Sequence, residues 1–440
     1  MKFFLILLLL ILISSCSFDN KTGIWNTTDE AISKKKDRYK GFETLYTQTK
    51  SFKKLIKPED NLEIVLDSIQ SNLKWTDEYY KNSNNLDHFS YKDTNELILK
   101  SKKLSRHKTK DTFLYNNQKV IVTDNKGNII VYSLENQEII LKYNFYKKKF
   151  KKIKKILSII IEKNIIYIGD NLGYLYALDY VNNKLIWAKS YKIPFRSNLK
   201  IKGKNILISD INNTLYFIDK KNGEKLKTIP TEENVVKNNF INSLALDENS
   251  LFYLNTYGSL YSIDDKGRIE WFINLNRSTN INPSNLFYSN PIVLHKDKLI
   301  VSTDLYLYIL NSNNGLTLSK TAITSLLKPV ISGENLFIIT KDNLLVSINL
   351  NSGKILYSID IDQNIAQFLD TKKKSVSVKF LTLINNELFL FLNNSYLVKF
   401  STIGKIKNIQ KLSSKLSSFP IFINKSIIYL NNKNKLIITN

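Results

Sequence analysis

Short apolar runs alternate with clusters of Asn, Gly, Asp and Lys every eight to twelve residues from about residue 96 onward. Runs such as NIIYIGD (164–170) and NLFIITK (335–341) have the length of buried strands, and the clusters between them have the composition of turns. No stretch carries apolar residues at helical spacing over a length that predicts a substantial helix. The pattern therefore predicts an all-β fold.

The same pattern repeats along the chain. The segment YLYALDYVNNKLIW (174–187) aligns with seven others on one apolar position of the repeat, and successive anchors lie 38 to 52 residues apart. This period is typical of propeller blades. The 52-residue interval contains an extra segment, TKKKSVS (371–377), which leaves seven blades as an alternative to eight. The eight anchors are Ile130, Tyr176, Tyr216, Tyr261, Tyr308, Val346, Val398 and Ile437.

Each unit has an apolar strand, a polar turn, the anchor strand, a Gly or Asn turn, and a third strand that ends at Trp187, Trp271 or Tyr357 in three units. The sequence between units supplies a fourth strand. A single four-stranded sheet cannot bury both of its faces, whereas radial packing of several sheets buries them. We therefore predict an eight-bladed β-propeller of four-stranded antiparallel blades over residues 96–440.

The two ends of the propeller region predict how the ring closes. The last unit stops at Asn440, directly after its anchor strand, and so lacks an outer strand. The segment NELILKSKKL (95–104) has strand character but no unit of its own. We expect this N-terminal strand to complete the last blade and to cover an edge that would otherwise expose unpaired backbone groups.

The N-terminus has the parts of an export signal. A basic start is followed by an apolar run, Phe3–Ile13, which is too short to span a bilayer, and then by small residues. The segment ISSC (13–16) resembles the bacterial lipobox, which predicts a signal peptide over residues 1–15 and lipidation of Cys16. An ordinary signal peptide with a chance cysteine is the alternative. Ser17, rather than Asp, favours an outer-membrane anchor facing the periplasm.

Two further segments precede the propeller. Residues 16–50 are polar and lack periodicity, so they are predicted to be a flexible tether. Residues 51–95 form an N-terminal extension, in which we expect a short strand around Leu62–Leu66 and loop over 76–95.

The charge of the chain changes this interpretation little. The sequence has 64 basic and 39 acidic residues, a net charge of +25. The lysines are dispersed and no nucleic-acid-binding motif accompanies them, so no nucleic-acid partner is predicted. The run KKKFKKIKK (147–155) is the densest cluster. It is either a solvated loop between blades or a patch for an anionic lipid surface.

The sequence carries no recognisable catalytic constellation. Cys16 is the one cysteine, and the three histidines, His88, His107 and His295, have no neighbours at metal-ligand spacing. No phosphate-binding loop or nucleophile elbow is present. We therefore predict no enzymatic activity, no metal and no cofactor. Recurring carboxylates are interpreted as hydrogen-bonding groups of turns: Asp170, Asp179, Asp210, Asp219 and Asp264.

A family resemblance narrows the function. Ala177, Asp179 and Trp187 resemble the tryptophan-docking repeat of the PQQ-dehydrogenase-like propellers, Ala-x-Asp-x-x-(Thr)-Gly-x-x-x-Trp, and Trp271 marks a second copy. The repeats are otherwise degenerate. Together with the lipobox and the tether, eight such repeats resemble the BamB family of lipoproteins, which belong to the outer-membrane β-barrel assembly machinery.

The resemblance implies a scaffold without catalytic activity at the periplasmic face of the outer membrane. Its partners would be the barrel-inserting subunit and nascent outer-membrane proteins. In the family, an Arg in a loop ahead of an inner strand contacts the partner, and the matching loop here is KIPFRSNLK (192–200). Arg196 is therefore the expected contact, with Phe195 and Asn198 beside it. The family's acidic pair is absent, because NNFINSLAL (238–246) carries Asn238, Asn239 and Asn242.

Two other functions remain open. A quinone-dependent dehydrogenase would need a funnel at the propeller axis lined by acidic and amide groups. A propeller that binds cell-wall glycan or a secreted partner would cluster aromatic residues on one face of the ring.

Overall fold

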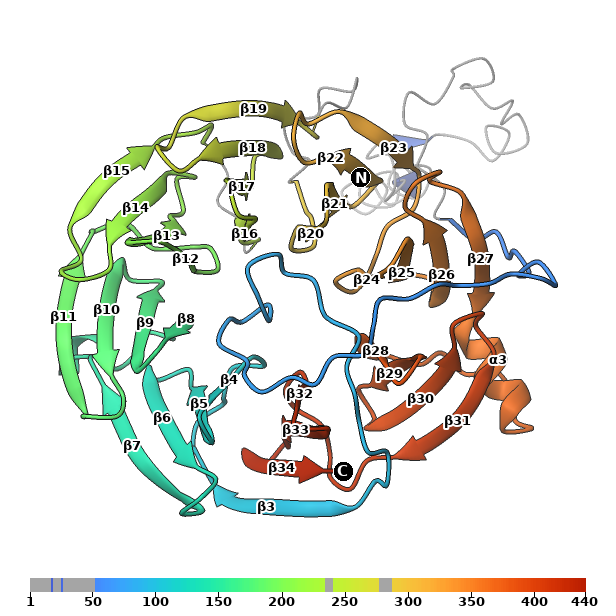
Figure 1. Ribbon diagram of the computed structural model, residues 1–440, viewed down its shortest axis with the longest axis horizontal. Coiled ribbons are helices and arrows are strands. Elements are labelled where there is room, and N and C mark those ends of the chain that lie inside the picture. The colour runs from blue at the N-terminus through green and yellow to red at the C-terminus, as the bar shows by residue number, and fades with distance from the viewer. Residues whose placement is uncertain (1–16, 19–24, 27–51, 234–239, 277–286) are drawn as a thin grey trace, which may run out of the picture. The chain divides into compact units, whose positions relative to one another are not determined.

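The alternation of apolar runs and turn residues produces eight four-stranded antiparallel sheets, which lie around a common axis as the blades of a propeller (Figure 1). The computed structural model describes residues 17–18, 25–26, 52–233, 240–276 and 287–440. Residues 51–440 form one compact unit. Residues 1–50 form another, in which β1 (Ser17–Phe18) pairs with β2 (Trp25–Asn26). The predicted signal peptide and Cys16 lie outside the described residues.

Each blade runs from an inner strand at the hub to an outer strand at the rim. The strands follow sequence order in blades 1 to 7, whereas the outer strand of blade 8 is β3. Blades 1 to 4 consist of β4 (Leu114–Asn116), β5 (Lys119–Thr123), β6 (Asn128–Ser133) and β7 (Glu138–Asn144); β8 (Leu157–Glu162), β9 (Ile165–Asp170), β10 (Tyr174–Asp179) and β11 (Lys184–Ser190); β12 (Lys200–Lys202), β13 (Asn205–Ser209), β14 (Leu215–Asp219) and β15 (Lys225–Ile229); and β16 (Ser243–Leu246), β17 (Ser250–Leu254), β18 (Ser259–Asp264) and β19 (Ile269–Asn274).

The remaining blades follow the same order. Blades 5 to 8 consist of β20 (Val293–His295), β21 (Lys298–Ser302), β22 (Leu307–Asn311) and β23 (Thr317–Thr321); β24 (Val330–Ser332), β25 (Asn335–Ile339), β26 (Leu344–Asn349) and β27 (Ile355–Asp360); β28 (Val378–Ile384), β29 (Glu387–Leu392), β30 (Tyr396–Ser401) and β31 (Ile406–Lys411); and β32 (Ile421–Ile423), β33 (Ser426–Leu430), β34 (Lys435–Thr439) and β3 (Leu97–Lys103).

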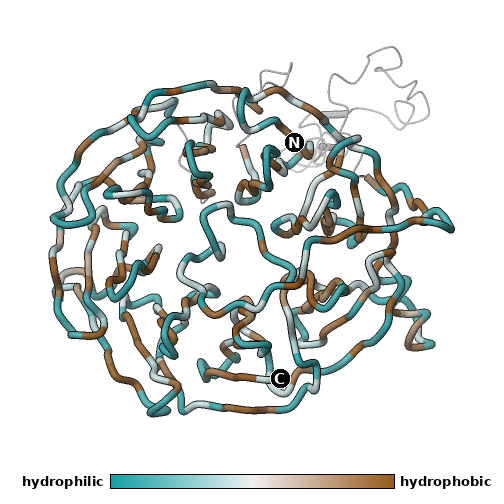
Figure 2. The backbone as a smooth tube through the Cα atoms, in the orientation of Figure 1, coloured by the Kyte–Doolittle hydropathy of each residue, from teal (hydrophilic) through white to brown (hydrophobic). Residues whose placement is uncertain are grey.

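The architecture confirms the predicted fold. All eight anchor residues lie on the third strand of their blades, and that strand is almost entirely buried. Figure 2 shows the hydrophobic runs along the strands and hydrophilic residues at the turns between them. Eight blades are present, so the seven-blade alternative is excluded.

The predicted closure is also confirmed. β3 pairs with β34, with Leu97 opposite Thr439, so the first propeller strand is the outer strand of the last blade (Figure 1). Two hydrogen bonds between Glu96 and Asn440 extend this ladder, with N···O distances of 3.2 and 3.0 Å. The chain ends are thereby joined through backbone hydrogen bonds, and no sheet edge opens between blades 8 and 1.

One helix, α3 (Ile361–Phe368), was not predicted. It follows blade 6, and the Asp360 side chain caps it by accepting a hydrogen bond from the backbone N–H of Gln363 at 2.9 Å. With the segment 371–377, it accounts for the long interval before Val398. No helix in the described part of the chain has the length and apolar character of a membrane span.

At three junctions between neighbouring blades, an aromatic side chain of the outer strand bonds to a turn of the next blade. The indole Nε1 of Trp187 donates to the carbonyl of Lys220 at 3.1 Å, and the ring lies against Gly223. Gly223 has a φ of +70°, and a Cβ there would lie 2.7 Å from the indole. The turn therefore requires glycine for two reasons, its backbone conformation and the close approach of the ring.

The same contact recurs with different side chains. Trp271 Nε1 donates to the carbonyl of Ser312 at 3.0 Å and lies against Gly315. Tyr357 Oη donates to the carbonyl of Thr402 at 2.7 Å. A tyrosine thus makes the hydrogen bond between blades where the repeat has lost its tryptophan.

The other residues of the repeat lie inside their own blade. Ala177 is fully buried on β10, opposite Trp187 on β11. Asp179 accepts hydrogen bonds from the backbone N–H groups of Val181 and Asn182 at 3.0 and 2.9 Å. All five recurring carboxylates accept backbone N–H groups of turns, but the turns are of two kinds. Those between second and third strands contain Asp170 and Asp210, and those between third and fourth strands contain Asp179, Asp219 and Asp264.

Residues 52–95 cross the hub of the ring (Figure 1). The predicted strand at Leu62–Leu66 is wrong: the segment forms no strand and belongs to none of the sheets. The extension instead bonds to the inner strand of every blade. In blade order, the contacts are Trp75 with β4, Thr76 with β8, Asp77 with β12, Asn82 with β16, Ser83 with β20, Asn85 with β24, Phe89 with β28 and Asn72 with β32.

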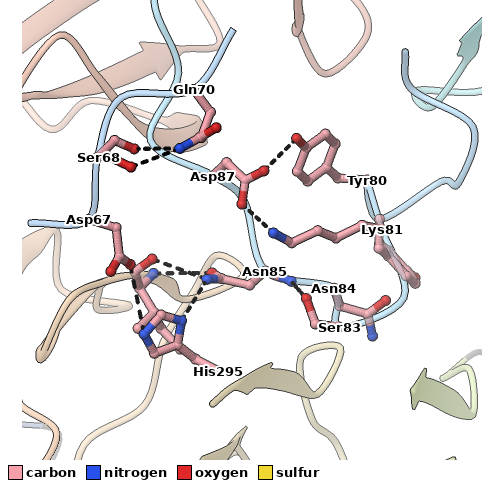
Figure 3. A network of polar contacts seen from close by, with 12 residues as sticks. Asp67, Ser68, Gln70, Tyr80, Lys81, Ser83, Asn84, Asn85, Asp87 and His295 are labelled. Atoms are coloured by element: carbon pink, nitrogen blue, oxygen red, sulfur yellow. Dashed lines mark hydrogen bonds and ion pairs between the residues drawn. The ribbon is translucent and has the colours of Figure 1, made fainter. Parts of the chain in front are cut away.

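Apolar and polar groups of the extension share the hub. Trp75, Tyr80 and Phe89 are buried in a chain of ring contacts, with centroid distances of 4.5 Å for Trp75–Tyr80 and 5.2 Å for Tyr80–Phe89. Phe89 in turn stacks on Phe422 of β32 at 5.3 Å. Figure 3 shows polar side chains of the extension, among them Asp87, which accepts hydrogen bonds from Tyr80 and Lys81.

One buried ion pair links the extension to blade 3. The Lys200 Nζ lies 2.6 Å from Asp77 Oδ2, and both side chains are almost completely buried. Lys200 also donates to the carbonyl of Lys81 at 2.8 Å. Burial lowers the pKa of Lys200, and the carboxylate of Asp77 opposes that shift. The ammonium therefore depends on Asp77 for its charge to be tolerated at the hub.

Two histidines of the hub are oriented by hydrogen bonds to the backbone. His88 Nε2 accepts from the backbone N–H of Asn386 at 2.8 Å, so the proton lies on Nδ1, which faces the carbonyl of Asp67 at 2.9 Å. His295 Nε2 faces the carbonyl of Gly333 at 3.0 Å (Figure 3). Burial lowers the pKa of both imidazoles, although Asp67 acts to raise them.

Removal of the buried carboxylate should destabilise the protein strongly. Asp77→Ala leaves the Lys200 ammonium buried without its counter-ion, so we expect the free energy of unfolding to fall by about 3–5 kcal/mol. Chemical denaturation measures this change. Glu59→Ala removes an exposed pair with Lys354 and should change stability by less than about 1 kcal/mol. Equal effects of the two substitutions would contradict the buried role of Asp77.

Because burial lowers the pKa of the two hub histidines, we expect the free energy of unfolding to fall on mild acidification. Because the folded protein lowers their pKa, the unfolded chain binds more protons between about pH 6.5 and the lowered folded pKa. The contribution of these histidines to stability should therefore be complete above about pH 6.5 and should decrease as the pH falls below it. Thermal unfolding between about pH 7.5 and 5 measures the slope. His88→Gln should reduce this slope, whereas substitution of the exposed His107 by Gln should leave it unchanged.

Candidate binding face

The ring has two faces that differ in their loops. One, which we call the connection face, carries the connections from each blade to the next and the turns between second and third strands. The other, the hairpin face, carries the remaining two turns of each blade. This division follows from the antiparallel order of every sheet. The connections on the connection face are longer than the turns, and their lengths differ from blade to blade. Such loops can carry binding residues without disturbing the sheets.

The predicted loop KIPFRSNLK lies on the connection face, between β11 and β12. Phe195 in this loop is buried, and its ring packs edge-on against Tyr191 and Tyr216 at centroid distances of 5.3 and 5.8 Å. Asn198 is buried as well. Its amide donates to the carbonyl of Leu244 at 3.0 Å and accepts from the N–H of Leu244 at 2.9 Å, which joins blade 3 to blade 4.

Arg196 differs from its neighbours. Its backbone is fixed, because its N–H donates to Ser209 O at 2.8 Å and its carbonyl accepts from Asn242 N at 2.9 Å. Its side chain is half-buried, and burial lowers the pKa of the guanidinium. In the described part of the chain, the guanidinium makes no hydrogen bond or ion pair. Of the three predicted contact residues, Arg196 is therefore the one whose side-chain donors are available to a partner.

The asparagines at the family's acidic positions are only partly described. Asn238 and Asn239 lie outside the described residues. Asn242 is fully buried, and its amide donates to Ser209 Oγ at 2.8 Å and to the carbonyl of Asp210 at 3.0 Å. Asn242 thus stabilises the contact between blades 3 and 4 rather than facing solvent.

A central hollow on the connection face was not found from the sequence. Its volume is 280 Å³, and its walls are mainly apolar. Lys328 lies at its edge and donates to the carbonyls of Asn84 and Tyr79 at 2.6 and 3.2 Å; burial lowers its pKa to about 7. The walls come from distant segments: Trp75, Tyr79, Leu86, Phe113, Pro291, Leu326, Leu327, Phe380, Leu381, Phe419 and Ile421.

The hairpin face has a larger and more polar hollow of 810 Å³ at the hub. Amide and carboxylate groups line it together with three lysines, Lys74, Lys81 and Lys296. In the part of the chain that the structure describes, no three His, Cys, Asp or Glu side chains converge as a metal site. The extension occupies the axis.

Comparison with known proteins identifies the family to which the chain belongs. A sequence model described as outer membrane protein assembly factor BamB matches residues 103–359. No curated protein sequence matches the chain.

Among solved structures, BamB from Moraxella catarrhalis is similar, with a TM-score of 0.61, 14% identity, and coverage of 78% of this chain and 99% of that one. A europium-containing methanol dehydrogenase is similar too, with a TM-score of 0.59, 10% identity, and coverage of 83% and 89%. At these identities the structural likenesses establish the fold alone. The family match spans more than half of the sequence, over blades 1 to 6, and so the chain belongs to the family of the outer membrane protein assembly factor BamB.

Proposed function

We propose that this protein is a lipid-anchored scaffold of outer-membrane protein assembly, without catalytic activity, that binds the barrel-inserting subunit through its connection face. Family membership supports the assembly role. The observation that carries the binding site is Arg196, whose backbone is fixed between two blades while its guanidinium has no acceptor among the described residues. An unpaired guanidinium on a fixed backbone is well suited to a carboxylate of a partner protein.

The central hollow would add an apolar contact with the partner to the polar contact that Arg196 makes. Leu326, at its edge, is 40% exposed. A pocket of 280 Å³ is large enough for one or two apolar side chains of a partner. We infer that Arg196 gives the complex its orientation and that the hollow contributes burial of apolar surface.

The outer strands offer a second type of contact, with extended segments of nascent outer-membrane proteins. Among the described residues, most outer strands are the last strand of their sheet and have a free edge at the rim (Figure 1). β27 is an exception, because Ile56 pairs with its Ser358. Several outer-strand side chains are exposed and apolar, including Phe272 at 60% and Leu226 at 46%. An unpaired edge with apolar side chains is the surface that β-augmentation uses.

Lipidation of Cys16 would place the protein at the periplasmic face of the outer membrane. The support for this is the ISSC segment after a short apolar run. Cell fractionation tests it: Cys16→Ser should move the protein out of the membrane fraction, and an unchanged distribution would contradict lipidation.

Reversal of the charge at position 196 should weaken the complex without unfolding the protein. We expect Arg196→Glu to reduce association with the barrel-inserting subunit by about tenfold or more, because it places like charges together. Co-purification and a direct binding titration measure the loss. The melting temperature should stay unchanged, since no side-chain bond within the described protein is removed.

Two controls give this test its specificity. Arg268→Glu changes an exposed arginine in a third-to-fourth-strand turn on the hairpin face and should leave the affinity unchanged. Asn198→Ala, in the same loop as Arg196, should instead lower the free energy of unfolding by about 1–3 kcal/mol. No association of the wild-type chain would overturn the proposal, and equal loss in Arg196→Glu and Arg268→Glu would overturn the assigned face.

A further inference from the structure

Basic side chains from three segments meet on the connection face around blade 1. The segments are the connection from β3 to β4, the turn Asp124–Asn128 and the connection from β7 to β8. The turn joins the other two, because Asn125 N–H donates to the carbonyl of Lys108 at 2.9 Å and its carbonyl accepts from Lys155 N–H at 3.0 Å. The basic patch comprises Arg106, Lys108, Lys126, Lys147, Lys148, Lys151, Lys152 and Lys154.

The charge of the basic patch is not compensated locally. None of its eight side chains has a carboxylate within 4.0 Å among the described residues. Acidic side chains near the basic patch have other partners. Asp124 is buried and accepts from Ser105 Oγ at 2.6 Å, and Asp111 lies 3.9 Å from Lys379. A surface with this density of unpaired charge attracts anions strongly.

The lysine-rich loop is anchored to the blades. Lys155 points inward: its side chain is buried, it donates to the carbonyl of Phe150, and it lies over the Tyr146 ring at 5.0 Å. Tyr146 donates to Asp170 Oδ2 at 2.7 Å. One inward lysine thus fixes the loop, while five others of the run are exposed. A fixed loop loses less conformational entropy when it binds.

Exposed apolar side chains occur among these lysines. Ile153 and Ile156 are 44% and 54% exposed. Phe150, the one aromatic residue of the run, is half-buried and packs edge-on against Tyr146 and Tyr174. It is therefore not presented for stacking on a base, which single-stranded nucleic-acid sites use. Isoleucines between lysines are instead typical of a surface that enters a bilayer interface.

A hollow between the segments provides room for a headgroup. Its volume is 320 Å³, and it lies between Lys108 and Thr109 on one side and Lys154 and Ile156 on the other, with Asp111 and Asp124 also in its lining. A phosphate in this position would lie between lysines of two segments. The apolar side chain of Ile156 borders the same hollow, as acyl-chain contact requires.

We propose that the basic patch, together with Ile153 and Ile156, docks on a bilayer surface that carries anionic phospholipid headgroups. Each lysine near such a surface contributes on the order of 1 kcal/mol, and the isoleucines add apolar insertion. This inference is independent of the partner-binding role, because it uses a different loop and no residue of the Arg196 site.

Co-flotation of the full chain with vesicles tests the proposal. Neutral phosphatidylcholine vesicles are compared with vesicles that contain about 30 mol% phosphatidylglycerol. Binding through residues 1–16 is common to both, so the measured quantity is the ratio of the two partition coefficients. We expect a ratio of at least about ten at low salt and a steep decrease at high salt.

Matched variants localise the effect. Substitution of Lys147, Lys148, Lys151, Lys152 and Lys154 by Gln should bring the ratio close to one. The control replaces five exposed lysines elsewhere by Gln and should keep most of the ratio: Lys100, Lys102, Lys103, Lys184 and Lys221. Ile153→Ser with Ile156→Ser should weaken binding to anionic vesicles while it retains the salt dependence.

Three results would overturn the proposal. One is a wild-type ratio near one at low salt. Another is an equal loss in the patch variant and the control, which would mean that net charge alone acts. The third is tighter binding of duplex DNA than of anionic vesicles at the same salt, which would identify nucleic acid as the occupant of the basic patch.

Discussion

Eight inner strands arranged around one axis leave a hub that no blade can fill, and the rest of the structure depends on how that space is occupied. Here the extension of the same chain fills it. Its backbone and side chains bond to the inner strand of every blade, so a single segment ties together sheets whose sequences lie far apart. Loss of the extension would expose eight inner strands and unpair Lys200 at once.

At the rim, neighbouring blades are joined by hydrogen bonds that more than one type of side chain can make. The indoles of Trp187 and Trp271 and the phenol of Tyr357 make the same hydrogen bond to the following blade. The requirement at this position is a flat, polar-tipped side chain that reaches a turn, and the glycine of that turn gives it room. Because several residue types satisfy this requirement, the repeat can become degenerate while the ring persists.

This contrast explains how much the sequence could predict. Third strands such as Tyr174–Asp179 are buried on both faces, so they appear as apolar runs at a regular period, and the blade count and the closure by Leu97–Lys103 follow. The extension has no such period. Asp77 bonds to Lys200, and Asn84 bonds to Leu244 and Ile292, and no spacing indicates pairs of that separation.

The candidate site was predictable only in part, for a related reason. Loop composition points to Arg196, but it does not separate a side chain that faces solvent from Phe195 and Asn198, which the adjoining blade buries. The central hollow is assembled from segments between Trp75 and Ile421, so no local pattern predicts it.

The hub and the closing strand stabilise the ring, whereas the connections between blades carry the proposed binding surfaces. Both termini of the propeller lie in blade 8, and the extension emerges from the hub beside the same blade, where Lys92 N–H donates to Lys425 O at 3.0 Å. The hub and the closing strand must therefore form together, which favours a single cooperative unit over independent blades. Connections such as Tyr191–Leu199 and Lys147–Lys155 are held at both ends by this unit. Their exposed positions can change at little cost to stability, and they are the segments on which both proposed surfaces lie.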